Sequence, residues 1–165
     1  MEKINLVNNF VDLQKQIQSK AQNILLASND NINDSTTISY GFMAEAQKYA
    51  SELGSRLNVL IQPRIINLNN SDNYVFNDIE INIMESDIFQ AQRLGIDRVS
   101  FAVLDTQNQI DEDAMEQLIS ASDGMQVCFT GIDSINEKQQ AASLDWLKEN
   151  GVDFYIKDNQ LNTLK

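Results

Sequence analysis

One arrangement recurs along the chain: a helical stretch ends at Gly, and a short run rich in β-branched or aromatic residues follows. Four of the six Gly residues stand at this point, namely Gly54, Gly95, Gly124 and Gly151. A Gly just past a helix end supplies the left-handed residue of a C-cap. The run that follows is typical of a strand buried on both faces, as in parallel sheets. The pattern therefore predicts helices that alternate with parallel strands.

The alternation predicts six strands and five helices. The predicted strands cover residues 4–7, 23–27, 58–62, 98–104, 126–129 and 153–156. The predicted helices cover residues 10–21, 40–53, 78–94, 112–121 and 135–150. Such βα repetition fits a (β/α)8 barrel or an open doubly wound sheet. Because the sequence has no G-x-G-x-x-G or G-x-x-x-x-G-K-[ST] motif, a nucleotide-binding doubly wound domain is disfavoured, whereas flavodoxin-like variants remain an alternative.

Capping signals support the predicted helix starts. Asn77–Glu80 and Ser134–Glu137 both have the spacing of a capping box. Asp111 is predicted to cap another helix, with acidic residues in its first turn. The cluster 111–113 could also be a cation site. Because acidic helix starts are so common, we interpret it as a cap that complements the helix dipole.

The composition excludes several functional classes. The chain has no His, which removes Ser-His-Asp and Cys-His catalysis and the commonest zinc and copper ligand. A single Cys excludes thiolate-clustered metal sites and an intrachain disulfide, which suits a reducing compartment. The formal net charge of −12 argues against nucleic acid or an anionic membrane as a partner. Because we find neither an export signal nor a membrane-length apolar run, we expect a cytoplasmic protein.

Several segments match one family pattern in register. LIQPR (60–64) resembles M-I-R-P-R, NYVFNDIEINIMESDI (73–88) resembles D-F-x-Y-S-x-x-E-x-x-x-M-x-x-D-I, and AQRLGIDRVSFAVL (91–104) resembles A-K-E-L-G-A-D-G-V-V-F-G-V-L. NILLAS (23–28), TISYGFM (37–43) and VCFTGID (127–133) match mainly by position. These segments resemble the CutC family, the copper homeostasis proteins built on a TIM barrel. The resemblance implies one CutC-like domain over residues 1–165.

The resemblance and the length together predict an α/β, TIM-barrel-like (β/α) repeat. A complete (β/α)8 barrel needs about 200 residues or more, whereas this chain has 165. We therefore expect about six parallel strands, incomplete relative to (β/α)8. Such a sheet would expose two hydrogen-bonding edges. We expect a homo-oligomer whose protomers cover the open barrel side; the alternative is a rearranged, closed or flattened sheet that needs no partner.

The departures from the family pattern fall on its polar positions. Arg64 and Asp133 match the family pattern. Leu25 and Ala27 stand where the family has Glu and Cys, and Gln62 stands where it has the first Arg of R-P-R. Phe129 and Thr130 replace a His and an Arg, and the stretch 157–160 replaces T-S-G-G. Soft metals prefer thiolate, thioether or imidazole ligands. Cys128 precedes the Phe that replaces the family His, so strand alternation predicts that it faces the outer helices as a packing residue. We therefore expect a degenerate site without a metal ligand set.

The polar residues that remain at predicted strand ends are the candidate binding residues. We single out Gln62, Arg64, Asp105, Thr130 and Asp133. The Arg64 guanidinium could grip the carboxylate or phosphate of an anionic small molecule, or it could pair with Asp133 or Asp105. Carboxylates at these ends, with Asp158, could hold a hard cation such as Mg²⁺. Because Asp is equally common in turns, we predict no metal site.

Lys157 ends the sixth predicted strand, where some aldolase-type barrels carry a Schiff-base lysine. Its neighbour Asp158 is acidic and no basic residue is close in sequence, so we predict no catalytic residue. The leading interpretation is a CutC-like, non-enzymatic protein with a degenerate site, no direct copper binding and no cofactor; copper is implied by the resemblance alone. The alternatives are a small barrel enzyme that acts on an anionic metabolite anchored by Arg64, and an interaction module whose open strands recruit a partner.

Overall fold

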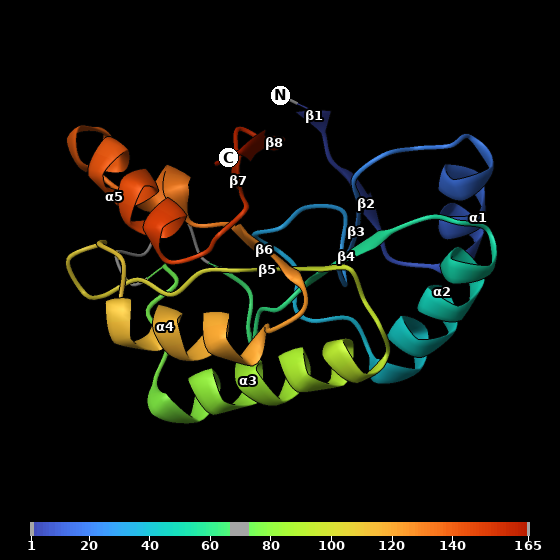
Figure 1. The fold of residues 1–165 in the computed structure, drawn as a ribbon, viewed down its shortest axis with the longest axis horizontal. Coiled ribbons are helices and arrows are strands. Elements are labelled where there is room, and N and C mark those ends of the chain that lie inside the picture. The colour runs from blue at the N-terminus through green and yellow to red at the C-terminus, as the bar shows by residue number, and fades with distance from the viewer. Residues whose placement is uncertain (1, 67–72, 165) are drawn as a thin grey trace.

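The structure, a computed structural model, describes residues 2–66 and 73–164. The strands are β1 (Glu2–Lys3), β2 (Asn5–Val7), β3 (Ile24–Leu26), β4 (Leu57–Leu60), β5 (Arg98–Phe101), β6 (Gln126–Phe129), β7 (Phe154–Lys157) and β8 (Gln160–Thr163). The helices are α1 (Phe10–Gln18), α2 (Tyr40–Glu52), α3 (Asp78–Arg93), α4 (Glu112–Ala121) and α5 (Glu137–Glu149), and a 3₁₀ turn, η1, spans Ile132–Ser134. The helices lie outside the strands (Figure 1).

The six predicted parallel strands are confirmed. They are β2 to β7, which lie side by side in chain order within one sheet. The sheet also contains β8, which the sequence analysis missed and which pairs antiparallel with β7. Figure 1 places this hairpin next to β1, with the N and C labels close together. The fold is thus a TIM-barrel-like α/β structure that is incomplete relative to (β/α)8.

The two edges of the parallel sheet meet through the N-terminal segment. Strand β1 pairs with β8, and β2 pairs with β3. Only Ile4 separates β1 from β2, so one extended segment joins both sides of the sheet into a nearly closed barrel. The prediction of two open edges is therefore wrong for the described residues, because β8 covers the edge of β7. The homo-oligomer inferred from those edges stays a prediction.

The strand residues divide between two apolar layers. The layer between sheet and helices includes Val127 and Phe129 of β6. The barrel interior includes Leu25, Leu60 and Cys128. The prediction that Cys128 faces the outer helices is therefore wrong, because Phe129 takes that side and strand side chains alternate. The large aromatic ring fits the helix-covered layer, whereas the small thiol fits the narrow interior.

Helix ends follow local chemistry. All four Gly residues of the recurring pattern have positive φ, between 72° and 89°. The capping box at Asn77 and Glu80 is confirmed, and Asp111 caps α4 as predicted. The predicted box at Ser134 is wrong: Asn136 accepts the capping hydrogen bond of α5, and Ser134 ends η1.

Candidate functional site

A cavity of about 860 Å³ opens at the carboxyl ends of the parallel strands. Its lining is formed by Ile156 of β7 and by the loops after β3, β4, β6 and β7. The loop residues are Asn31, Ile32, Asn33, Asp34, Ile65, Ile66, Tyr74, Thr130, Asp133, Ser134, Asp158 and Asn159. This is the end of a βα barrel where binding and catalytic sites are built. Its volume is in the range of small-molecule sites.

Thr130 and Tyr74 are the most buried polar residues that line this cavity. Thr130 is 7% exposed, and its Oγ1 has no hydrogen-bond partner among the described residues. The Tyr74 hydroxyl donates to the carbonyl oxygen of Thr130 at 3.2 Å. Burial, with a smaller contribution from the negative charge of Asp133, raises the pKa of Tyr74 to about 12. The phenol is therefore a neutral donor near neutral pH, and the Thr130 hydroxyl is a buried polar group in the wall of the cavity.

Asp133 and Asp158 meet at the rim of the cavity. The Asp133 Oδ2 accepts a hydrogen bond from the backbone N–H of Asp158 at 3.1 Å. Asp158 and Asn159 have positive φ values of 51° and 60° and form the two-residue turn between β7 and β8. Such a turn matches the right-handed twist of the strands. The hairpin therefore brings a second carboxylate beside Asp133.

Gln62 lies at the end of β4 but does not line this cavity. It is 2% exposed, and its Nε2 donates to the carbonyl oxygens of Ile32 and Ser35, each at 2.8 Å. Its backbone N–H donates to Thr37 Oγ1 at 2.9 Å. The side chain therefore fixes the loop after β3, which supplies one wall of the cavity.

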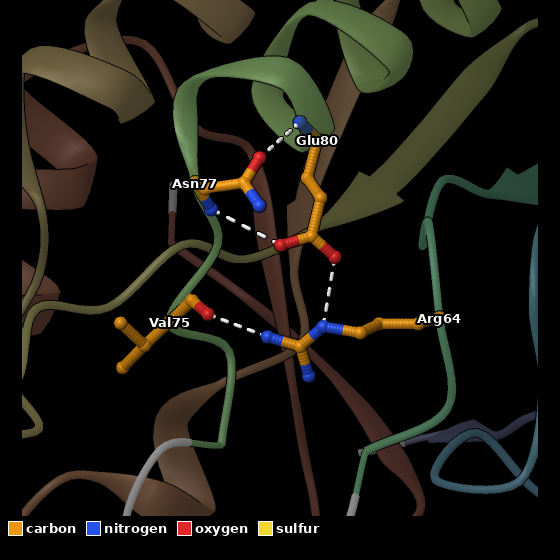
Figure 2. Close-up of polar contacts among 4 residues, drawn as sticks. All are labelled: Arg64, Val75, Asn77 and Glu80. Carbon is orange, nitrogen blue, oxygen red and sulfur yellow. Dashed lines mark hydrogen bonds and ion pairs between the residues drawn. The ribbon is translucent and has the colours of Figure 1, made fainter.

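Arg64 is also held away from the cavity. Its Nε donates to Glu80 Oε2 at 2.8 Å, and its Nη2 donates to the carbonyl oxygen of Val75 at 2.6 Å (Figure 2). The guanidinium also lies 4.9 Å from the centroid of the Phe76 ring. Glu80, in turn, belongs to the capping box of α3 with Asn77. The partner of Arg64 is thus Glu80, not Asp133 or Asp105, and these contacts anchor the start of α3.

The other candidates have local partners. Asp105 Oδ1 accepts from the backbone N–H groups of Gln107 and Gln109, as expected for a residue that stabilises a turn. Lys157 Nζ donates to Gln140 Oε1 at 2.9 Å. Of the five predicted binding residues, the structure thus brings Thr130 and Asp133 together in the cavity and places Gln62, Arg64 and Asp105 outside it.

The sequence analysis missed Tyr74 and three polar residues of the loop after β3, although the neighbouring Asn29 and Asp30 are polar residues at a predicted strand end. That loop supplies Asn31, Asn33 and Asp34 to the cavity lining. Its concentration of Asn, Asp and Ser after a buried strand was a usable signal, because loops at this end of a barrel carry the site. Tyr74 gave no such signal, since an aromatic residue before a helix is more often read as packing.

Within residues 2–66 and 73–164, no thiol or thioether group lines this cavity, so these groups do not form a copper site there. Cys128 is fully buried in the barrel interior, and burial raises the pKa of its thiol to about 12, so the sulfur stays protonated. Met43, Met84 and Met115 are buried between the sheet and the helices. Over residues 2–66 and 73–164, no three His, Cys, Asp or Glu side chains are grouped so that they could hold a metal ion. In the same ranges, no helix is both long and apolar enough to cross a bilayer.

Comparisons with known proteins agree with the barrel geometry. A CutC family protein of Enterococcus faecalis is 33% identical over 145 residues, which cover 87% of this chain and 66% of the relative. The solved structure of CutC from Streptococcus agalactiae, a candidate copper homeostasis protein, has a TM-score of 0.83 and 32% identity, and the match covers 94% of this chain and 71% of that one. Deoxyribose phosphate aldolase from Aeropyrum pernix matches with a TM-score of 0.61 at 10% identity, covering 93% of this chain and 60% of that one, which shows the barrel fold alone.

The chain thus spans just under two thirds of the length of its Enterococcus relative. The family profile of CutC matches residues 3–160, nearly the whole chain. Together with the nearly closed, mostly parallel barrel, this match shows that the protein belongs to the CutC family.

Proposed function

We propose that this CutC-family barrel does not coordinate copper through its own residues and instead binds a small polar organic molecule in the cavity at the carboxyl end of the strands. The observation that carries this proposal is the donor set. The described lining offers hydroxyl, carboxylate and amide groups but no thiol, thioether or imidazole. Copper(I) prefers those softer ligands. A part in copper homeostasis, as suggested for the Streptococcus relative, would then be indirect.

The charge of the cavity lining indicates which class of ligand the cavity would accept. Three carboxylates, Asp34, Asp133 and Asp158, line the cavity, and no Lys or Arg does among the described residues. An anion would be repelled by these carboxylates, whereas an amine or a neutral polyol would be accepted. We therefore favour a cationic or polyhydroxylated ligand for this cavity.

The enzyme alternative is less well supported. It requires Arg64 to anchor an anionic metabolite at this end of the barrel. The guanidinium instead contacts Glu80, Val75 and Phe76. Recruiting it to the cavity would break an ion pair and a hydrogen bond of 2.6 Å.

NMR titrations with ethanolamine, ribose and malonate test the proposal. We expect ethanolamine or ribose to shift the amide signals of Thr130 and Asp133, and malonate to leave them unchanged. Asp133→Asn should weaken ethanolamine binding, whereas Asp113→Asn, an exposed carboxylate on α4, should not. Binding of malonate alone at these signals would contradict the proposed ligand class.

A further inference from the structure

A second cavity, of about 730 Å³, lies at the opposite end of the barrel. Among its lining residues are Leu57, Arg98 and Gln126, which begin β4, β5 and β6. Because these strands are parallel, their starts mark the amino-terminal end of the barrel. The inner cluster that includes Leu60 and Cys128 fills the barrel interior. The two cavities therefore share no lining residue among the described residues.

The charge of this cavity is opposite to that of the whole chain. Lys20, Arg56 and Arg98 line it, and Asp97 is its only carboxylate among the described residues. The Asp97 Oδ2 already accepts from the backbone N–H of Leu57 at 3.3 Å. Yet the chain carries only 12 basic residues against 24 acidic ones. A basic cavity on so acidic a protein creates a local attraction for anions.

Arg98 is held in a fixed position inside this cavity. Its Nη2 and Nε donate to Gln126 Oε1 at 2.9 Å and 3.3 Å. Its guanidinium carbon lies 3.9 Å from the centroid of the Phe154 ring, in cation–π geometry. Among the described residues it forms no ion pair. Burial lowers the pKa of Arg98, but a guanidinium remains protonated near neutral pH.

The carboxamides of Asn58 and Gln126 line the same cavity. Cα pairing sets Asn58, Arg98 and Gln126 at one level across three adjacent strands, facing the same side of the sheet. The oxygen of Asn58 is occupied by the Ser100 hydroxyl at 2.8 Å, and that of Gln126 by Arg98. The amide NH₂ group of each has no partner in the described part of the chain. This level therefore presents hydrogen-bond donors without free acceptors.

Helix dipoles account for two of the three basic side chains that line this cavity among the described residues, but not for Arg98. Lys20 and Arg56 follow the ends of α1 and α2 and complement the negative ends of these helices. Arg98 begins a strand and is partly buried, so no helix end requires its charge.

The carboxylates of Asp153, Glu2 and Asp97 favour the charged form of Arg98 without forming a direct ion pair with it among the described residues. Burying a guanidinium without a directly bonded anion is costly, so an oxyanion in this cavity would repay part of its lost hydration.

We propose that the cavity at the amino-terminal end of the barrel binds a small oxyanion, a phosphate or carboxylate group, through Arg98, Asn58 and Gln126, with Lys20 and Arg56 at its rim. The Arg98 guanidinium donates two parallel hydrogen bonds to the anion, and the amide groups of Asn58 and Gln126 supply the others. The rim cations add an attraction that salt screens.

Calorimetric titrations with inorganic phosphate and with citrate, at constant ionic strength, test this site and separate the two sources of oxyanion. We expect at least one of them to bind, and Arg98→Met to weaken binding by about tenfold or more, because it removes charge-assisted hydrogen bonds. Arg98→Met keeps the apolar contact with Phe154. The matched control is Arg93→Met, which removes an exposed Arg at the end of α3, outside the cavity.

The double variant Lys20→Gln with Arg56→Gln keeps the test decisive if Arg98→Met does not fold. Both side chains are exposed, so this variant should fold and bind the oxyanion about threefold to tenfold more weakly. Absence of phosphate and citrate binding to the unaltered protein would overturn the proposal. Equal losses in the Arg98 and Arg93 variants would also overturn it, because they would show only an effect of net charge.

Discussion

Replacing Gln62 by Met tests whether this residue fixes the loop after β3 or binds a ligand. Met has a similar length but no amide, so the carbonyl oxygens of Ile32 and Ser35 lose their hydrogen bonds of 2.8 Å. The backbone hydrogen bond to Thr37 is independent of the side chain and should persist. The change therefore isolates the two contacts of Nε2.

The expected loss of stability follows from these two carbonyls. Each buried acceptor left without a donor costs about 1–2 kcal/mol, so Gln62→Met should lower the free energy of unfolding by about 2–4 kcal/mol. For a chain of this size the corresponding fall in Tm is roughly 5–15 °C. The control is Gln107→Met, at an exposed turn position, where a change within about 0.5 kcal/mol is expected.

Urea unfolding followed by circular dichroism measures both variants. A decrease in the denaturation midpoint of Gln62→Met, with an unchanged m-value, would agree with a structural role. An unchanged midpoint in the Gln62 variant would refute the reasoning, since it would show that the loop does not depend on this amide.

Three further predictions concern the same end of the barrel and its interior. Arg64→Met should lower the free energy of unfolding by about 1–2 kcal/mol in urea denaturation, through loss of the partly exposed ion pair with Glu80 and of the cation–π contact; a larger loss of ligand affinity than of stability would instead favour the anchoring role. Thr130→Val should raise the free energy of unfolding by about 1 kcal/mol in the same assay, because Oγ1 is buried without a partner, and a loss of stability would show that the hydroxyl is satisfied. Stability should fall as the pH rises from about 9 to about 12, because the pKa values of Tyr74 and Cys128 are raised to about 12 from 10.0 and 9.0 and only the unfolded chain ionises in that range. Each group contributes a slope of about 1.4 kcal/mol per pH unit, so Tyr74→Phe should flatten the alkaline fall, and an unchanged profile would contradict the burial of the phenol.

The parallel core could be predicted because its signals are local. A Gly after four of the five helices, and a β-rich run after each of these Gly residues, identify β4, β5, β6 and β7 without any tertiary information. The β8 strand could not be found in this way, since Gln160–Thr163 is mostly polar and very short. The Asp158–Asn159 pair was the available signal, because both residue types tolerate the left-handed conformation of a two-residue hairpin.

The candidate site was predicted less completely, for two physical reasons. The strand sequences RVSF and QVCF alternate in polarity, and Cys128 shares its side of the sheet with Ser100, its Cα partner. The helices cover the apolar side of these strands, so the alternation of polarity indicated that the Cys128 thiol faces the barrel interior. The prediction instead placed the family His position, now Phe129, in the interior and therefore turned Cys128 outward. The partner of Arg64 depends on how the loop after β4 meets the start of α3, which no local pattern specifies.

Competition for copper(I) against a chromophoric chelator, under anaerobic and reducing conditions, tests the central claim most directly. The unaltered protein and its Cys128→Ala variant are titrated in parallel. Because the thiol is buried and protonated and the sequence has no His, we expect the chelator to retain the metal equally in both titrations. Stoichiometric transfer of copper(I) to the unaltered protein, lost in Cys128→Ala, would contradict the claim.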